Sequence, residues 1–295
     1  MIVIERVPVE DLVVKGSKIP QPGEAALLWS EEVNSNNHPK DPQDEEVAPL
    51  HYKDEVMKTH LDKYESLINY PTAWKHEFTQ QEHSVLLAAT SGGILCSRRP
   101  KCYAEELEEI QSRLEKAWQV GSWFMRFAGS SPKDSTVKYP ITTAAQVIDC
   151  IVTSKRAFGS LGDGNNTLYF VAWDPSWDSS RELRCFVRKN KLTAISQYVW
   201  HEVGYFSTLS TEELLQIGLR VSQLVESLAP KISATTHTSD FVIDLYLTPD
   251  DTIRIVELNS FGYWLASGSA LFHWLRDKAK LYNTENMVYF RVLAT

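Results

Sequence analysis

The chain has 295 residues, of which 43% are hydrophobic and 23% are charged, and its formal net charge is −8. This length is typical of one large domain or two lobes. Nine Trp, twelve Tyr and eleven Phe supply ample material for a packed core, which excludes disorder of the whole chain. A negative net charge does not favour nucleic-acid binding, because that affinity comes mainly from neutralising phosphates.

The amino-terminal sequence MIVIERVPVE has no basic segment followed by a long apolar core, so we expect no secretory signal. No apolar run approaches the ~20 residues that a membrane-spanning helix needs. The four cysteines include no Cys-x-x-Cys pair, which argues against structural zinc and against a disulfide framework. We therefore expect a soluble, cytoplasmic protein.

The first part of the chain is predicted to contain a strand, a linker and two helices. Residues 1–30 include a short strand candidate, and residues 31–50 are polar, acidic and proline-rich, as linkers are. Apolar residues at helical spacing predict helices over 54–68 and about 103–118. His60, on the apolar side of the first helix, is interpreted as a packed histidine rather than a ligand.

From about residue 121 the pattern changes to strands. Thr143 with Gln146 forms a capping box that predicts a helix to about residue 158, and Ser210 with Glu213 predicts one to about residue 228. A tight hairpin is expected at the sequence RKNK. Helices on a mostly antiparallel sheet indicate an α+β fold. The predicted strands are 122–128, 167–173, 183–187, 192–200, 240–247 and 252–259.

The last predicted hairpin carries the strongest chemical signal. With a turn at 248–251, Asp244 lies opposite Ile255, and its side chain shares a face with Glu257 and Asn259. The two carboxylates would then be diagonal neighbours on adjacent strands. Carboxylate and amide oxygens are ligands that Mg²⁺ prefers, so this face is a candidate metal site.

Two alternatives stay open for this hairpin. Its acidic residues could belong to an ordinary solvent-exposed face, and a one-residue slip in register would point Asp244 the other way. The strand FVIDLYL is otherwise very apolar, however, and a carboxylate in a buried strand needs a partner.

Two arginines also lie inside apolar strands. Arg126 is central in WFMRFA and Arg184 is central in ELRCFV. A guanidinium group suits phosphate, and the alternative is a structural salt bridge, for example with Glu182 or Asp134. The sequence GSSPKDS could form a small polar loop over phosphates, but the P-loop pattern is absent. The run SGSA is interpreted as a flexible loop by its composition, and 129–136 and 262–270 are candidates for loops that close over a site.

Several segments resemble a known family. The runs WFMRFAGSSPKD, RELRCFVRKNKLTAISQYVW and DFVIDLYL…IRIVELNSFG, in this order within about 122 to 274, resemble the cell division cycle protein 123 (D123) family. That family is a branch of the ATP-grasp fold, in which two lobes hold Mg-ATP. The resemblance implies a two-lobed ATP-grasp α+β fold with mostly antiparallel sheets. We expect an amino-terminal segment with the acidic linker at 1–52, and lobes at 53–172 and 173–295.

The resemblance also implies roles for individual residues, with ATP and Mg²⁺ as cofactors. Arg126 and Arg184 match basic positions on the ATP phosphates, and both are the expected catalytic residues. The phosphate loop contributes Ser130, Ser131 and Lys133, and the hinge that would hold the adenine edge contains Ala172 and Trp173. The implied metal ligands are Asp244, Glu257 and Asn259.

The sequence departs from the family pattern at several of these positions. Where the family has Asp-Phe-Asn-Pro-Phe-Gly, this chain has Glu257-Leu-Asn-Ser-Phe-Gly262, and Glu-x-Asn is the more general pattern of ATP-grasp ligases. The hinge lacks the usual basic residue before its tryptophan. A lysine that precedes the hinge in the family is either replaced by Thr153 or shifted to Lys155.

These features favour an enzyme that joins a small carboxylate to an amine. In such a ligase, Mg-ATP phosphorylates the carboxylate, and the amine then displaces phosphate from the acyl phosphate with net release of ADP. The alternative is an assembly chaperone for the gamma subunit of eukaryotic translation initiation factor 2, which is the role of the best-known family members. We expect neither a membrane partner nor a nucleic-acid substrate.

Overall fold

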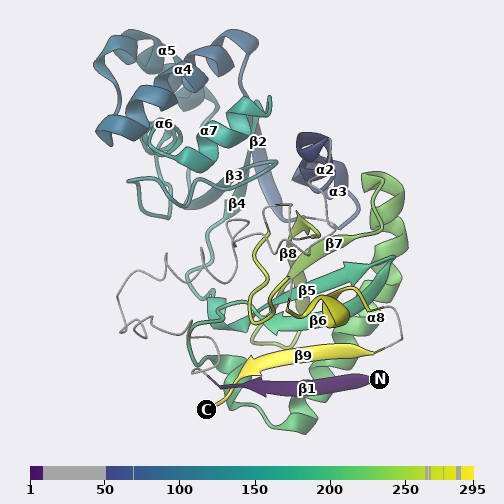
Figure 1. Cartoon of the computed structure of the whole chain (residues 1–295). Coiled ribbons are helices and arrows are strands. Elements are labelled where there is room, and N and C mark those ends of the chain that lie inside the picture. The colour runs from purple at the N-terminus through teal and green to yellow at the C-terminus, as the bar shows by residue number, and fades with distance from the viewer. Residues whose placement is uncertain (9–50, 69, 263–264, 266, 275, 284–286) are drawn as a thin grey trace, which may run out of the picture. The chain divides into compact units, whose positions relative to one another are not determined.

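The computed structural model describes residues 1–8, 51–68, 70–262, 265, 267–274, 276–283 and 287–295. The chain forms two compact units, coloured by residue number in Figure 1. Unit 1 comprises Met1–Thr59, Ser66–Ile68 and Trp177–Thr295, and unit 2 comprises His60–Glu65 and Asn69–Ser176. The predicted acidic linker and most of the predicted segment 1–52 lie outside the described residues.

Unit 1 is built on a six-stranded sheet. Its strands lie in the order β1-β9-β6-β5-β7-β8, and β9 pairs in parallel with both β1 and β6 while the other pairs are antiparallel. Strands β1 and β9 run side by side in Figure 1, so the first and last strands of the chain complete one edge of the sheet. The strands are β1 (Ile2–Val7), β5 (Glu182–Arg188), β6 (Lys191–Gln197), β7 (Phe241–Leu247), β8 (Ile253–Ser260) and β9 (Val288–Leu293).

The hairpin between β5 and β6 forms as the sequence predicts. Arg188 pairs with Lys191, so the loop contains only Lys189 and Asn190. Both loop residues have positive φ, 49° and 61°, which is the conformation that a two-residue hairpin turn requires. The short turn fixes β5 against β6 and leaves the other edge of β5 for β7.

The hairpin between β7 and β8 forms in a different register from the predicted one. Leu247 pairs with Ile253, one residue later than expected, and a β-bulge between Asp244 and Leu245 shifts the register by one residue more. A shift of one residue would place Glu257 on the face opposite to Asp244, whereas a shift of two residues returns it to the same face as Asp244. Asp244 and Glu257 are therefore directly opposed rather than diagonal neighbours.

The long helix of unit 1 is α8 (Thr211–Thr236). The predicted capping box is confirmed, because the Ser210 side chain accepts from the Glu213 N–H and Glu213 bonds back to the Ser210 N–H. The helix continues past its expected end near 228 and includes Pro230, since buried residues continue at helical spacing as far as Thr236. The shorter elements are α2 (Tyr52–Met57), α9 (Lys278–Leu281) and the 3₁₀ turns η3 (Ser179–Arg181) and η4 (Tyr205–Thr208).

Unit 2 packs helices against a three-stranded antiparallel sheet of order β2-β4-β3. Its core contains side chains from β2, β3 and β4 and from α4 to α7. These four helices lie close together in Figure 1. The strands are β2 (Thr72–Glu77), β3 (Trp123–Phe127) and β4 (Thr167–Ala172). The helices are α3 (Leu61–Tyr64), α4 (Gln80–Cys96), α5 (Ala104–Ala117), α6 (Ala144–Val152) and α7 (Lys155–Gly162), with a 3₁₀ turn η2 (Lys101–Tyr103) before α5.

Two of the predicted helices are each divided in the structure. The helix expected at 54–68 is wrong as a single element, because His60 is extended (φ −68°, ψ 145°) and separates α2 from α3. The helix that begins after Thr143 has its predicted capping box but ends at Val152. The Ser154 side chain then accepts from the Ala157 N–H and starts α7. At Ser154, local capping thus interrupts a continuous apolar pattern.

The two units divide the chain at other points than the expected lobes, 53–172 and 173–295. Unit 2 continues to Ser176, and unit 1 includes β1 and α2, since β1 pairs with β9 and α2 packs against β8. Strands β2 and β9 and helix α4 were not predicted from the sequence. Across the described ranges, no helix is both long and apolar enough to span a bilayer.

Candidate functional site

The predicted metal ligands meet on one face of β7 and β8. Asp244 pairs with Glu257 across the two strands, and directly opposed Cβ atoms lie about 4.5–5.5 Å apart. The Asn259 amide Nδ2 donates to Asp244 Oδ2 at 3.0 Å and lies 3.4 Å from Glu257 Oε1. Asp244 is 1% exposed, so this carboxylate is held inside the protein. The structure thus brings together all three residues that the hairpin pattern selects.

The partner of Arg184 is Asp244. The antiparallel pairing of β5 with β7 places these two residues directly opposite each other. Arg184 Nε donates to Asp244 Oδ1 at 2.9 Å and Nη2 donates to Asp244 Oδ2 at 2.8 Å, which is the bidentate geometry of a strong ion pair. Arg184 thus has an ion pair of the kind that the salt-bridge alternative describes, and its partner is Asp244. Glu182 instead accepts from Trp177 Nε1 at 2.7 Å.

Two further groups complete the surroundings of Arg184, and sequence reasoning missed both. Arg184 Nη1 donates to the Gly268 carbonyl at 2.8 Å, and the Arg184 guanidinium carbon lies 4.9 Å from the centre of the Tyr198 ring. Gly268 lies 84 residues after Arg184 in the chain, so no local pattern around Arg184 indicates this contact. Tyr198 could have been found, because it follows β6 in the resembling segment.

The charges of Arg184 and Asp244 interact strongly, because both side chains are buried and little water screens them. Burial alone would lower the pKa of Arg184, but the charge and hydrogen bonds of Asp244 outweigh it and raise that pKa above its ordinary value. The Arg184 charge lowers the pKa of Tyr198, whereas burial and the nearby carboxylates raise it, with a net value of about 12. Burial raises the pKa of the Cys185 thiol, which keeps it protonated and unreactive.

The segment that follows β8 is packed against the cluster rather than exposed. Ser267 and Ser269 are 4% and 0% exposed. The Ser267 hydroxyl donates to the Ser260 carbonyl at 2.5 Å, and Trp274 Nε1 donates to the Ser267 carbonyl at 2.9 Å. The interpretation of SGSA as a flexible loop is therefore wrong for its described residues, because hydrogen bonds to β8 and Trp274 hold them.

The donor set at β7 and β8 suits a hard divalent cation. Two carboxylates and one amide oxygen are the ligand types that Mg²⁺ takes, usually together with water or substrate phosphates. Within the described residues there is no group of three or more His, Cys, Asp or Glu arranged to hold a metal ion. Metal binding here would therefore depend on the amide of Asn259 and on a phosphate ligand, in addition to Asp244 and Glu257.

In unit 2, Arg126 lies on β3 opposite Tyr169 of β4. It is 3% exposed, and its Nε donates to the Phe127 carbonyl at 3.2 Å. Burial raises the pKa of Tyr169 to about 12, with nearby acidic residues adding to the effect and Arg126 opposing it. The structure therefore confirms a buried cation in this strand. Its assignment to ATP phosphates stays a prediction.

The predicted phosphate loop of unit 2 is fastened to α7. Asp134 accepts from the Ser154 hydroxyl at 2.5 Å and from the Lys155 N–H at 2.9 Å. The Ser130 hydroxyl lies 2.9 Å from the Ser160 hydroxyl. Lys133 is exposed, and its Nζ lies 5.5 Å from the centre of the Phe124 ring. These bonds give the loop a defined shape at the amino-terminal end of α7.

Other residues of the loop and hinge have more local roles. Ser131 is 2% exposed, and its carbonyl accepts from the Lys133 N–H at 2.9 Å. Ala172 is exposed at the end of β4, and Trp173 is 36% exposed. The Trp173 N–H donates to the Ser122 carbonyl at 2.8 Å. An adenine contact from Trp173 would therefore use its carbonyl or its indole ring.

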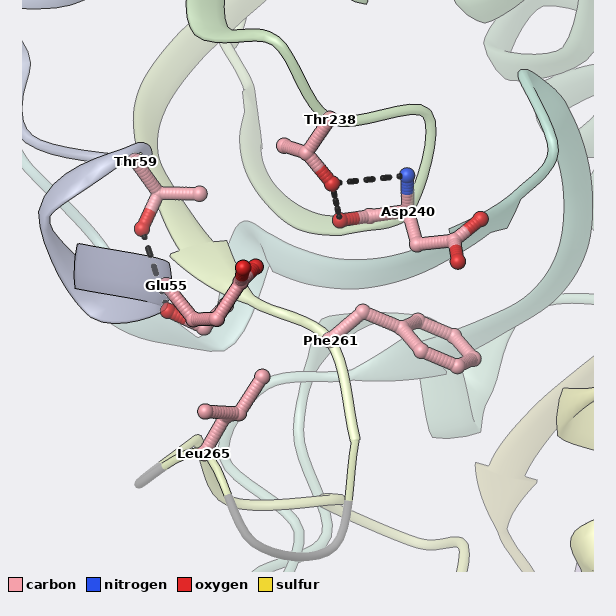
Figure 2. A pocket seen from close by; sticks show the side chains of 7 residues that line it. Glu55, Thr59, Thr238, Asp240, Phe261 and Leu265 are labelled. Atoms are coloured by element: carbon pink, nitrogen blue, oxygen red, sulfur yellow. Dashed lines mark hydrogen bonds between the residues drawn. The ribbon is translucent and has the colours of Figure 1, made fainter. Parts of the chain in front are cut away.

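Unit 1 also has a small polar cavity of about 140 Å³, shown in Figure 2. Its two carboxylates each have a basic partner: Glu55 pairs with Lys58 at 2.6 Å, and Asp240 pairs with Arg188. The cavity therefore has little unbalanced charge to select a ligand. Its lining residues are Glu55, Thr59, Thr238, Asp240, Ser260, Phe261 and Leu265.

Comparisons with known proteins agree with the resemblance described above. The D123 family model matches residues 165–295. The structure of a C-terminally truncated Cdc123 from Schizosaccharomyces pombe is similar, with a TM-score of 0.59 and 21% identity over 82% of this chain and 98% of that chain. A second structure of Cdc123 from the same organism has a TM-score of 0.57 and 20% identity, with the same coverage. No curated protein sequence matches the chain significantly.

The resemblance to the D123 family is thus confirmed for the carboxyl-terminal part of the chain, and the likeness to Cdc123 shows the fold. The expected α+β fold with mostly antiparallel sheets is confirmed, and it is the fold of Cdc123. The D-alanine–D-alanine ligase from Coxiella burnetii is more distant, with a TM-score of 0.35 and 13% identity over 76% of this chain and 53% of that chain.

Proposed function

We propose that this chain binds a magnesium–nucleotide complex, Mg-ATP, through the face shared by β5, β7 and β8. One observation carries the proposal: a carboxylate that is 1% exposed, Asp244, lies directly opposite both Glu257 and Arg184. Such a concentration of charge in apolar strands is costly to fold, and it is typical of sites that bind ions or perform chemistry. The structural alternative, an ion pair alone, would not require Glu257 and Asn259 on the same face.

The residues of unit 1 have distinct proposed roles. Asp244, Glu257 and Asn259 would hold Mg²⁺, whose chemical contribution is to neutralise charge on the phosphates. Arg184 would contact phosphate, because a guanidinium fork matches phosphate oxygens as well as it matches a carboxylate. Arg184 is also the proposed catalytic contact for charge that develops on a transferring phosphoryl group.

The proposed roles in unit 2 follow from the family resemblance. Arg126 and Lys133 would contact phosphates, with Ser130 and Ser131 in the same loop. The hinge residues Ala172 and Trp173 would contact the adenine. The local hydrogen bonds of the loop to α7 support these roles, since a preformed loop loses little conformational freedom on binding.

The use of the nucleotide that we favour is ligation of a carboxylate to an amine. The γ-phosphoryl group would move from ATP to a carboxylate oxygen, which leaves ADP. Attack by the amine would then form the amide bond, break the carbon–oxygen bond to phosphate and release a proton. The pattern Glu257-x-Asn259 supports this reading, because it follows the general ATP-grasp ligase pattern rather than that of the D123 family.

The second candidate is an assembly chaperone for the gamma subunit of eukaryotic translation initiation factor 2. The match of residues 165–295 to the D123 family model favours it. Under this proposal the nucleotide would serve as a structural element or a slow switch. A cytoplasmic location remains a prediction under either candidate.

The experiment that separates the candidates measures ADP and AMP release from the purified protein with Mg-ATP, pooled amino acids and small carboxylates. Asn259→Ala is the blank, because it removes a proposed ligand without leaving Arg184 unpaired. ADP release that requires the pool and disappears in the variant would establish the ligase, and AMP would indicate adenylate chemistry. Tight Mg-ATP binding without turnover, together with a stoichiometric complex with the gamma subunit, would establish the chaperone.

A further inference from the structure

The guanidinium of Arg184 covers both oxygens of the most deeply buried proposed metal ligand. Nε and Nη2 bond to Asp244 Oδ1 and Oδ2 at 2.9 and 2.8 Å. The Asn259 Nδ2 donates to the same Oδ2 at 3.0 Å and approaches Glu257 Oε1. Every one of these contacts presents positive or partly positive hydrogen to oxygens that a cation would use. A cation that binds here must therefore compete with them.

A cation near Asp244 would also meet the charge of Arg184. The side chains of Arg184 and Asp244 are 10% and 1% exposed, so little water screens this repulsion. The strands cannot move apart to relieve it, because β5 is paired along its length with both β6 and β7. The element that can change is the Arg184 side chain, whose other contacts are the Gly268 carbonyl and the Tyr198 ring.

We propose that Arg184 is an internal competitor of the divalent cation for Asp244, and that a nucleotide phosphate removes this competition by binding the guanidinium in place of the carboxylate. This inference rests on the proposed function, since it concerns the same face. A phosphate offers Arg184 the same bidentate hydrogen bonds, so the exchange conserves them. Metal and nucleotide then strengthen each other's binding by the same factor, as thermodynamic linkage requires.

The test measures Mn²⁺ binding by electron paramagnetic resonance of the free ion, with and without a non-hydrolysable ATP analogue. In the wild-type protein, Mn²⁺ alone binds weakly, and we expect the analogue to strengthen its binding by on the order of 5–150-fold, the usual range of coupling between sites. In Arg184→Gln, Mn²⁺ alone binds more tightly than in the wild type, and the strengthening by the analogue is largely lost.

Arg188→Gln is the matched control. Arg188 lies on the same face of β5 and also pairs with an aspartate, Asp240, so its ion pair is distinct from that of Arg184 with Asp244. We expect this variant to retain wild-type Mn²⁺ binding and wild-type coupling. Loss of coupling in Arg188→Gln as well would contradict a specific role for Arg184.

Arg184→Lys keeps the charge but cannot form the bidentate fork, so it tests the inference if Arg184→Gln folds poorly. Its Mn²⁺ affinity without nucleotide should lie between those of the wild type and Arg184→Gln, because lysine frees part of the carboxylate but keeps the repulsion. Unchanged or weaker Mn²⁺ binding in the folded Arg184 variants, with intact Mn²⁺–nucleotide binding in the wild type, overturns this inference and leaves the proposed function standing. Absence of Mn²⁺–nucleotide binding in the wild type overturns both.

Discussion

Among the described residues, each unit buries one arginine in the middle of a strand, and the two arginines have different neighbours. Arg184 in unit 1 faces Asp244 on the adjacent strand and forms a bidentate ion pair with it. Arg126 in unit 2 faces Tyr169, and its Nε donates to the Phe127 carbonyl. Both residues interrupt apolar strands of similar composition.

Strand pairing, rather than the strand's own sequence, therefore determines which group a buried arginine contacts. Opposite a carboxylate, the guanidinium stabilises the fold and blocks the carboxylate oxygens at the same time. Opposite Tyr169, the cation of Arg126 instead opposes the rise in the pKa of the phenol that burial causes. In unit 1, the ion pair of Arg184 with Asp244 therefore contributes to folding and also occupies the proposed binding site. We expect substitutions of these residues to change stability and binding together.

Asp244→Ala should destabilise the protein most, because it would leave the Arg184 charge buried without its carboxylate. Losing one partner of a buried ion pair costs about 3–5 kcal/mol in the free energy of unfolding. Urea denaturation followed by circular dichroism measures this loss. The double variant Arg184→Met with Asp244→Leu should recover most of it, because an apolar pair of similar volume is close to neutral.

The matched control for Asp244→Ala is Asp240→Ala, which breaks the ion pair of Arg188 on the same strand. That pair is partly exposed, so we expect a loss of about 1 kcal/mol or less in the free energy of unfolding. An equal loss in both variants would contradict a special role for the buried pair, and the two arginines of β5 would then be energetically alike.

A smaller effect is expected in unit 2 from Asp134→Ala. This substitution removes the acceptor for the Ser154 hydroxyl and the Lys155 N–H at the start of α7. Loss of such a helix cap costs about 1 kcal/mol. Hydrogen exchange at the first turn of α7 should become faster, whereas exchange in β3 around Arg126 should stay unchanged. Glu109→Ala, an exposed site on α5, serves as the control for a surface carboxylate.

The smallest effect concerns His60, a histidine of unit 2 that is 5% exposed. Burial lowers its pKa, Asp62 and Asp163 oppose this, and Arg126 adds to it. Because the folded pKa lies below the unfolded value of about 6.5, the unfolded state binds the proton more readily. The contribution of His60 is therefore complete above that value and is lost as the pH falls below it. His60→Gln should flatten this part of the pH–stability curve, and an identical curve would show that His60 does not titrate differently on folding.

Much of the fold follows from local sequence signals. The capping boxes at Thr143 and Ser210 act within one turn, and the two-residue turn at Lys189 and Asn190 needs no distant contact, so each was predictable. The division of the helix expected at 54–68 was not, because its two pieces pack in different units. A local apolar pattern cannot show which core each residue enters.

In the site, too, features set by neighbouring residues were predictable, and contacts between residues distant in the chain were not. The shared face of Asp244, Glu257 and Asn259 was predictable from a two-residue period. The direct opposition of Asp244 and Glu257 was not, since it depends on a longer turn and a β-bulge. The ion pair with Arg184 requires the order of strands in the sheet, and the Gly268 carbonyl reaches Arg184 through the fold of a later segment.

The most direct test of the proposed site is an isothermal titration of the wild-type protein and of Asn259→Ala with ATP, each with and without Mg²⁺. Arg254→Ala, an exposed site on β8, is the control. We expect one ATP to bind the wild type and the control only when Mg²⁺ is present, and this binding to be lost in Asn259→Ala while its thermal stability changes little. Mg²⁺-dependent ATP binding that persists in Asn259→Ala, or its absence from the wild type, would contradict the assignment of the site.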